Sequence, residues 1–562
     1  MKDHAELHVT EPSREYDTPL DVIHGTWPAN LRGHAFIIGP TQPTAVPFVW
    51  VGPGIVTRVD LEATADRRPH WISKFVVTPE IAVLGALAMT HEPQELAALA
   101  AGSAPCLTNT SMHFLGPQML LTHDPGRPAL FDPVSLTYRS YVGGLAAYPA
   151  VNEHPLFANC WTTAHPVEDP DEGCMWWCNQ HYRPLGGRSL TDAEGTLHIV
   201  RWRGNGEIDW WAAPGARIMQ GIHEVACTQD YVIFCEVGFQ PEMGAIAGMG
   251  QRTKPHMPWT DIYLVAKRDL TDARKGRSVP VSHARVPREA FHQFADYEQE
   301  GDDIVLYVAH SNGQDVNFPL DANDRLWHSK EPIPKAMIAY MSSPSDASPV
   351  ARYVIDGRTG EIKHHTVCSR PDRLWGAQLY GRDVRPQGIG RHRYAWQAYG
   401  GYRPDMLVER QVQMYAGNPY RIVDVDQLPE DPIPSAVSCH RLDDLEVVSS
   451  YAFPEEAYGQ SPIYAPDTVG DSEGWVLSFV QFPDRTELYV FDATELDNGP
   501  VAIASAPGLK QSYQVHSAWV RTLTPVEGSH HFQPYARDLA GRWESLPAKT
   551  KAVVKPVIDQ FS

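Results

Sequence analysis

The feature that most constrains the fold of this chain is a long series of short apolar runs separated by turn-forming residues. From Leu107 onward, such runs alternate with segments rich in Gly, Pro, Asp and Asn, with clear examples at 114–121, 197–202, 231–237, 303–309, 393–399 and 475–480. Runs of this kind are typical of β-strands, and their density predicts an all-β protein, either a propeller or a large sandwich. No repeat of fixed period is present, so an irregular propeller stays open while a regular repeat array is disfavoured.

The composition is that of a folded protein and excludes some partners. Hydrophobic residues make up 43% and charged residues 20% of the 562 residues, as in ordinary folded domains. A net charge of −21 argues against nucleic acid, because no basic stripe is present to neutralise phosphates. The chain has no apolar run long enough to span a membrane and no signal-peptide pattern at its start. Eight cysteines are too few for a disulfide scaffold, so a cytoplasmic location is expected.

Three segments differ from the rest of the chain. Residues 1–20 are expected to form an N-terminal leader, and residues 21–562 a single domain. Residues 76–104 are rich in Ala and Leu, which predicts two short helices broken at Glu92 and Pro93. This stretch is either a buried packing element or an apolar cap with peripheral membrane contact. The apolar, Gly-rich residues 240–258 are expected to be a second cap insertion, extending from one blade of a propeller.

Short catalytic motifs are missing from the chain, including the nucleophile elbow, the phosphate-binding loop and the zinc-protease helix motif. A metal site would therefore have to be assembled from distant residues. Four histidines stand out because each lies at the edge of a separate strand-like run, namely His165, His223, His292 and His516. Each one alone is explained more simply as a hydrogen-bonded core histidine, so the residues by themselves leave the metal site open.

Several motifs of the chain resemble, in the same order, those of the carotenoid cleavage oxygenases. This family includes enzymes that cleave carotenoids, apocarotenoids and stilbenes, and the retinoid isomerases. The matching segments span about residues 24–520 and include G-T-W-P-A-N-L-R-G-H-A-F-I-I-G-P, L-T-N-T-S, T-A-H-P-V-E-D-P, H-E-V-A-C-T-Q-D-Y-V-I-F, F-H-Q-F-A-D-Y-E, D-S-E-G-W-V-L and H-S-A-W. The four histidines fall on the family's four metal-ligand positions.

The resemblance implies a seven-bladed β-propeller with an apolar helical and loop cap over an iron site. The expected cofactor is Fe(II), held on the propeller axis by His165, His223, His292 and His516. Neutral imidazole suits Fe(II), and four imidazoles leave up to two octahedral positions for O₂ and an access channel. The implied reaction is O₂-dependent cleavage of one conjugated C=C bond into two carbonyl products.

The resemblance is weaker for the acids that orient the histidines in this family. The first acid is expected to be Asp124 and the third is replaced by Gln460, while residues 377–382, where the second is expected, contain no acid. Glu298 is an acid that the chain retains. Such partners fix the tautomer of a ligating imidazole, and their loss costs about 10–100-fold in metal affinity or activity. A retuned site is therefore expected.

The leading hypothesis is a dioxygenase that acts on a carotenoid or apocarotenoid. The apolar stretch 76–104 favours a lipid-borne substrate. The main competing substrate is a stilbene or phenylpropenoid. Two further hypotheses are a non-oxygenative isomerase that uses the same iron as a Lewis acid, and a family member with a degenerate site that binds a polyene without converting it.

Overall fold

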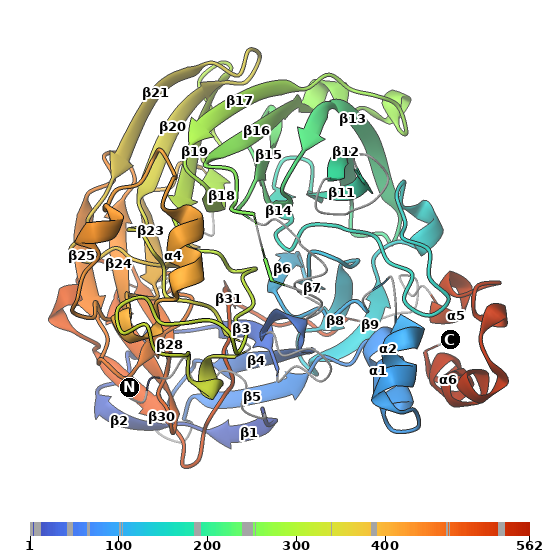
Figure 1. The fold of residues 1–562 in the computed structure, drawn as a ribbon, viewed down its shortest axis with the longest axis horizontal. Helices are drawn as coiled ribbons and strands as arrows, with labels where there is room; N and C mark the ends of the chain where they lie inside the picture. The colour runs from blue at the N-terminus through green and yellow to red at the C-terminus, as the bar shows by residue number, and fades with distance from the viewer. Residues whose placement is uncertain are drawn as a thin grey trace.

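In a computed structural model of the chain, seven antiparallel sheets stand side by side around a central axis (Figure 1). The structure describes residues 4, 13–41, 49–64, 68–100, 103, 105–184, 193–238, 251, 252, 254–338, 340–383, 390–467, 470, 472–526 and 534–561. Each sheet is one blade, and in five of the seven the strands follow one another in sequence, as in propellers. The prediction of an all-β, seven-bladed propeller is confirmed.

Five blades are built from four consecutive strands each, with the first strand innermost. The first of these blades contains β6 (Ser111–Leu115), β7 (Gln118–Thr122), β8 (Ala129–Asp132) and β9 (Thr137–Tyr141). The second contains β10 (Val167–Asp169), β11 (Cys174–Pro184), β12 (Ala193–Trp202) and β13 (Ile208–Ile218). The third contains β14 (Ile222–Cys227), β15 (Tyr231–Glu236), β16 (Trp259–Ala266) and β17 (Ser282–Pro287). The fourth contains β18 (Ala290–Ala295), β19 (Asp303–His310), β20 (Val350–Asp356) and β21 (Ile362–Cys368). The fifth contains β22 (Ala377–Arg382), β23 (Tyr394–Tyr399), β24 (Ala436–Arg441) and β25 (Val447–Ala452).

The last two blades close the ring by joining the two ends of the chain. One blade contains β2 (Asp21–Gly25), β26 (Tyr458–Gly459), β27 (Ile463–Ala465), β28 (Trp475–Gln481), β29 (Thr486–Asp492) and β30 (Ala502–Ser505). The other contains β1 (Tyr16–Pro19), β3 (His34–Pro40), β4 (Gly54–Asp60), β5 (His70–Phe75) and β31 (His516–Val520). Strand β31 pairs with β3, so that His516 lies opposite Ile38. Strand pairing between early and late residues thereby closes the ring.

Helices are short and lie outside the blades. They are α1 (Pro79–Ala88), α2 (Pro93–Ala100), α4 (Glu409–Tyr415), α5 (Tyr535–Asp538) and α6 (Ala548–Gln560). Three-residue 3-10 helices lie at Val49–Val51, Leu145–Ala147, Lys267–Asp269, Asp272–Arg274, Lys335–Met337, Pro404–Met406, Val425–Gln427, Leu496–Asn498 and Trp543–Ser545. The two helices expected within 76–104 are confirmed as α1 and α2. Helix α1 begins where the Thr78 hydroxyl accepts a hydrogen bond from the Ile81 amide, with Pro79 in the first turn.

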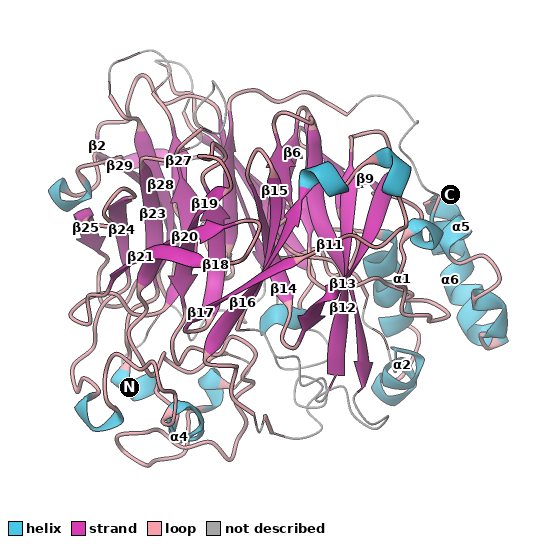
Figure 2. Cartoon of the chain, turned by 90° about the horizontal axis from the view of Figure 1, so that it is seen from above, coloured by secondary structure: helices cyan, strands magenta, loops and turns pink. Residues whose placement is uncertain are grey.

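Of the two alternatives for residues 76–104, the structure supports the packing element, because α1 and α2 lie at the rim of the ring beside α5 and α6 (Figures 1 and 2). Val83 and Leu87 of α1 are fully buried in a cluster that includes Val554 and Ile558 of α6. The C-terminal helices therefore cover the apolar face of α1, and the packing interpretation of this stretch holds. The peripheral membrane contact stays a prediction.

An apolar cover does lie next to the axis, but other segments build it. One buried cluster contains Val49, Phe318, Met337 and Val515, and Phe291 packs against it. Residues of 316–341 and the segment around α4 supply most of its members. Most of 240–258 lies outside the described residues, and its last part, 254–258, leads into β16. Within the expected leader 1–20, residues 16–19 form β1, which pairs with β5.

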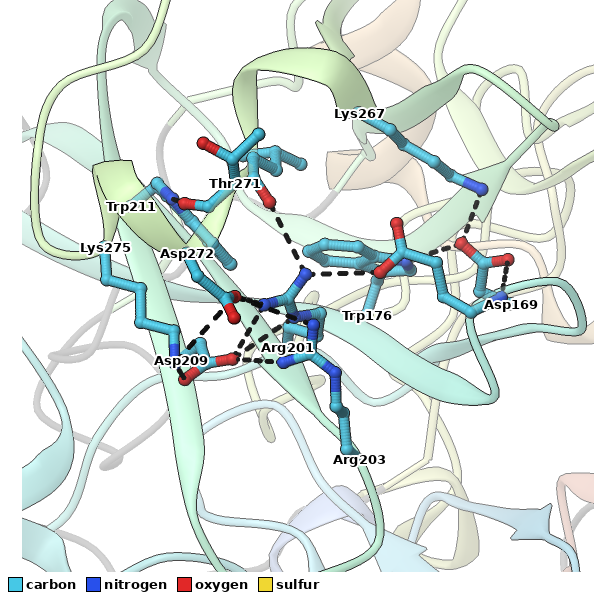
Figure 3. A network of polar contacts seen from close by, with 12 residues as sticks. Asp169, Trp176, Arg201, Arg203, Asp209, Trp211, Lys267, Thr271, Asp272 and Lys275 are labelled. Atoms are coloured by element: carbon cyan, nitrogen blue, oxygen red, sulfur yellow. Dashed lines mark hydrogen bonds and ion pairs between the residues drawn. The ribbon is translucent and has the colours of Figure 1, made fainter.

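A buried arginine also joins two adjacent blades. Arg201 of β12 is 3% exposed and lies 4.9 Å from the ring of Trp211, and its guanidinium contacts Asp209 and Asp272 at 2.9 and 2.6 Å (Figure 3). Asp272 belongs to the connection that follows β16, so this contact ties the second blade to the third. No helix among the described residues is long and apolar enough to cross a membrane.

Candidate metal centre

The four histidines predicted as ligands converge at the propeller axis. His223 lies in β14, His292 in β18, and His516 is the first residue of β31. His165 lies just before β10, where its backbone bonds to the strand that carries His223. Each histidine therefore comes from the innermost edge of a different blade. All four are at most partly exposed, and three are buried.

The strands that carry two of these histidines are irregular where the histidines lie. The register of β14 against β15 shifts between Ile222 and Val225, and that of β18 against β19 shifts between Ala290 and His292. The next blade has a shift in β22, between Ala377 and Leu379. Such bulges bend a strand and change the direction of its side chains. Here they occur on three successive blades at the level of the histidine cluster.

The geometry of the cluster fits a single metal ion. One ligand atom from each histidine can be chosen so that all four lie within 4.8 Å of one another. The Nε2 atoms of His165 and His516 are 3.1 Å apart. Two nitrogen ligands about 2.0–2.2 Å from one ion and at right angles are about 2.8–3.1 Å apart. The donor set therefore suits an ion held by imidazole nitrogen.

Burial keeps two of these imidazoles neutral. Burial, followed by the neighbouring imidazoles of the cluster, holds the pKa of His165 and of His516 well below the ordinary value. A neutral imidazole has one nitrogen with a free lone pair, which is the form that binds metals. Both rings are thus in the state that a ligand requires.

Asp124 supports His223, as the sequence predicts for an orienting acid. The Nδ1 atom of His223 lies 2.9 Å from Oδ2 of Asp124 and 3.1 Å from Oδ1. Oδ1 also accepts a hydrogen bond from the Ala164 amide at 2.9 Å, next to His165. Burial lowers the pKa of His223, but the Asp124 carboxylate outweighs it and the pKa is raised. An Nδ1–H donated to Asp124 leaves Nε2 for the metal.

Gln460 and Glu298 are placed differently from the expectation. Gln460 is buried, and its side-chain nitrogen lies 3.4 Å from Oε1 of Gln481. Its side-chain oxygen is buried without a hydrogen-bond partner, and no bond joins it to His516 in the described part of the chain. Glu298 is exposed in the turn after β18, and among the described residues it has no bond to the cluster. Among the described residues, neither side chain forms a hydrogen bond to a histidine of the cluster. Their roles in orienting the histidines therefore stay predictions.

Four further side chains near the cluster have no recognisable signal in the sequence. Glu224 follows His223, is buried, and has a pKa raised by burial to about 7. The rings of Tyr380 and Phe291 lie 5.8 and 4.6 Å from that of His292. His113 lies 5.7 Å from His165, ring to ring, and its Nε2 lies 3.2 Å from the Ala164 carbonyl oxygen. Because Tyr380 and His113 contact histidines of other blades, the local sequence around these two residues could not have shown the contacts.

A small cavity adjoins the cluster. It has a volume of about 20 Å³ and is lined by His292, Phe294, Tyr380, Val350 and other side chains of the fourth and fifth blades. A space of this size holds one water molecule. A larger cavity of about 380 Å³ is lined by residues of β11, β12 and β13 such as His198, and the four histidines do not line it.

Comparisons with known proteins give the family. A family model described as retinal pigment epithelial membrane protein matches residues 9–521. A search of curated protein sequences found no match.

Among solved structures, a mutant of apocarotenoid oxygenase from Synechocystis is 17% identical with a TM-score of 0.60, and the alignment covers 93% of this chain and 100% of that chain. Lignostilbene dioxygenase from Pseudomonas brassicacearum is 17% identical with a TM-score of 0.60, covering 92% of this chain and 98% of that chain. A cobalt-substituted form of the Synechocystis enzyme gives the same identity, TM-score and coverage as the Pseudomonas enzyme. These structural similarities establish the shared propeller, and the family match over nearly the whole chain shows that this protein belongs to the carotenoid cleavage oxygenase family.

Proposed function

We propose that this protein is an Fe(II)-dependent dioxygenase that cleaves a conjugated C=C bond of a carotenoid or apocarotenoid into two carbonyl products. The observation that carries the proposal is the set of four imidazoles at the propeller axis, with ligand atoms within 4.8 Å of one another. Nitrogen donors of this kind suit Fe(II). The family match and the two oxygenases with the same propeller support the choice of reaction.

The residues of this chain would hold the ion and orient its ligands. His165, His223, His292 and His516 would bind Fe(II), which when bound supplies the activation of O₂. Asp124 holds the His223 ring through the 2.9 Å contact to Nδ1, so that its Nε2 points into the cluster. The Nε2 atom of His165 is held beside that of His516 by backbone pairing, of His165 with Glu224 and of His516 with Ile38.

An apolar polyene fits the surroundings of the cluster. Phe291 contacts the rings of His223 and His292 and also packs on the apolar cluster that contains Val515. This aromatic side chain therefore links the histidines to apolar side chains of the cover. A long conjugated substrate has apolar faces that can pack against such a surface, and fixed placement of the reacting double bond is a large part of catalysis.

The test is aerobic incubation of iron-loaded protein with a panel of carotenoids, apocarotenoids and stilbenes, with the products identified by mass spectrometry. Under ¹⁸O₂, we expect two carbonyl products that carry the label. Products with an isomerised double bond and no label would instead support an isomerase. Cleavage of stilbenes alone would overturn the proposed substrate class but would agree with the proposed reaction.

The matched variant is His223→Ala. We expect its iron content to fall far below one ion per chain, together with loss of cleavage, because one of four ligands and the Asp124 contact are lost at once. Unchanged iron content in this variant, with no products from the parent protein, would contradict the proposal and favour a polyene-binding protein.

A further inference from the structure

Glu224 is a buried carboxylate placed between strands that carry two of the histidines. It follows His223 in β14 and is 4% exposed. Its Oε2 accepts a hydrogen bond from the Gln293 amide at 2.7 Å, and its Oε1 accepts one from the Tyr380 hydroxyl. A buried carboxylate without partners would be costly, and here both oxygens have a donor.

Both partners of Glu224 are neighbours of His292. Gln293 is the next residue in β18, and its side-chain amide donates to the Glu224 carbonyl oxygen at 2.6 Å. The ring of Tyr380, from β22, lies edge-on to that of His292 with 5.8 Å between centroids. One side chain therefore joins the innermost strands of three blades at the level of the cluster.

The strand ladder alone does not fix these residues. The register shifts within 222–225 of β14, 290–292 of β18 and 377–379 of β22 interrupt regular pairing next to each residue of this contact. A bulge leaves its extra residue unpaired and bends the strand. The bonds to Glu224 thus supply fixed contacts between the three strands where regular pairing is interrupted.

We propose that Glu224 and Tyr380 are positioning residues for the metal centre, which act as a pair to hold the His292 ring in its ligand orientation relative to His223. This inference rests on the proposed function, because it assumes that the four histidines bind a metal ion. The second orienting acid was expected within residues 377–382 of β22, which contain none. The inference assigns the support of His292 to a carboxylate of β14 instead. The Tyr380 hydroxyl connects that carboxylate to β22.

The third blade contains a matched pair, Glu236 and Tyr263, for which no bond to the four histidines is seen among the described residues. Glu236 is 1% exposed, its Oε2 accepts hydrogen bonds from the amides of Met219 and Gln220 at 2.9 and 2.7 Å, and its Oε1 accepts one from the Tyr263 hydroxyl at 2.9 Å. Burial, backbone donors and a tyrosine partner are thus the same as at Glu224. None of these partners is a ligand histidine or its neighbour in sequence.

The experiment measures Co(II) binding to metal-free protein by visible absorption, together with the melting temperature of each metal-free variant. The variants are Glu224→Gln, Tyr380→Phe and the double variant, with Glu236→Gln and Tyr263→Phe as controls. In Glu224→Gln, the new side-chain NH₂ group faces the Gln293 amide or the Tyr380 hydroxyl, so one of the two hydrogen bonds is disturbed. In Tyr380→Phe, the ring stays but the hydroxyl that donates to Glu224 is lost. We expect each Glu224 and Tyr380 variant to bind Co(II) about tenfold more weakly and with a changed spectrum. The double variant should lose little more than either single one, because the two residues act as a unit.

The control variants should lower the melting temperature and leave Co(II) affinity within about twofold and the spectrum unchanged. Parent-like affinity and spectrum in Glu224→Gln and Tyr380→Phe would overturn the proposal while the metal site stands. Equal losses of affinity in the control variants would also overturn it, because the effect would then be one of general stability. A parent protein that binds no Co(II) would overturn both this proposal and the metal centre.

Discussion

The axis and the rim of this propeller differ in the state of their buried titratable side chains. At the axis, four imidazoles face one another, and burial together with their neighbours keeps two of them neutral. At the rim, Arg127 is paired with Asp538 at 2.7 Å, both nearly fully buried, and the guanidinium lies 4.3 Å from the ring of Tyr141. At the rim, the charges of Arg127 and Asp538 neutralise each other. At the axis, the neutral imidazoles of His165 and His516 each have a nitrogen lone pair that can bind a metal ion. We therefore expect changes at the rim to alter stability and changes at the axis to alter metal binding.

The largest effect is expected at the rim, from Asp538→Ala. Asp538 belongs to α5, pairs with Arg127, and accepts a hydrogen bond from the Leu145 amide at 2.9 Å. Removing one partner of a buried ion pair costs about 3–5 kcal/mol, because the other charge stays buried. The measurement is thermal or urea unfolding, and Co(II) affinity of the folded variant should match the parent.

A control for this variant exists in the neighbouring helix. Lys555 and Asp559 of α6 form an exposed ion pair at 2.9 Å, and exposed pairs contribute little. Lys555→Gln should leave the melting temperature nearly unchanged. If Asp538→Ala weakened Co(II) binding as much as it lowered stability, the separation of rim from axis would be wrong.

The second-largest effect expected is a pH dependence of the free energy of unfolding, which arises from Glu80 at the rim. Glu80 of α1 is 2% exposed, and burial raises the pKa of its carboxyl to about 7, although the Cys106 amide bonds to it and Arg127 lies near. Between the ordinary value of 4.5 and about 7, the unfolded chain loses this proton while the folded chain keeps it. Rising pH therefore lowers the free energy of unfolding over that window, by about 3 kcal/mol in total.

The variant Glu80→Gln removes this titration and keeps a side-chain oxygen for the Cys106 amide. Unfolding should be followed from pH 4.5 to pH 8 in parent and variant, so that other buried carboxyls cancel in the difference. We expect the variant to gain stability relative to the parent as the pH rises, with no further gain above about pH 7. Parallel profiles would show that Glu80 is not the source of the slope.

The third effect is expected at the axis, from Asp124→Asn. Asp124 lies at a position where the sequence predicted an orienting acid, and it bonds to His223 of the cluster. Asparagine retains an oxygen for the His223 Nδ1–H but removes the charge. We expect Co(II) affinity to fall about 10–100-fold, with a far smaller change in the melting temperature than in Asp538→Ala. A loss of stability without a loss of affinity would place Asp124 with the rim residues.

Local patterns predicted the strands but left a propeller and a sandwich open, and it was the resemblance in motif order that predicted the seven-bladed propeller and singled out the four histidines. Each of the four histidines lies at the edge of an apolar run, and the Ala- and Leu-rich stretch contains the two helices that were expected, α1 and α2. The helices' position could not be predicted, since it depends on α6, which is more than 400 residues away in sequence and covers Val83 and Leu87.

The supports of the histidines were harder to predict than the histidines. Asp124 contacts His223 across 99 residues of sequence, and it was found because its place in the motif order is regular. Glu224 and Tyr380 are 156 residues apart and meet where three strands have bulges, which no local pattern shows. Gln460 occupies the position expected for an acid, yet the turn of its side chain toward Gln481 depends on how β26 and β28 meet.

The smallest effect is expected for Gln460→Ala, although this residue lies in the segment where the family pattern has an acid. Among the residues that the structure describes, its side-chain oxygen has no hydrogen-bond partner, and its amide contact to Gln481 is long at 3.4 Å, so its loss removes little that a metal ligand depends on. Co(II) affinity should change by less than about threefold, well below the effect of Asp124→Asn. An affinity loss as large as that of Asp124→Asn would show that His516 depends on Gln460 when metal is bound. The axis would then be supported on both sides, and the contrast between Asp124 and Gln460 would disappear.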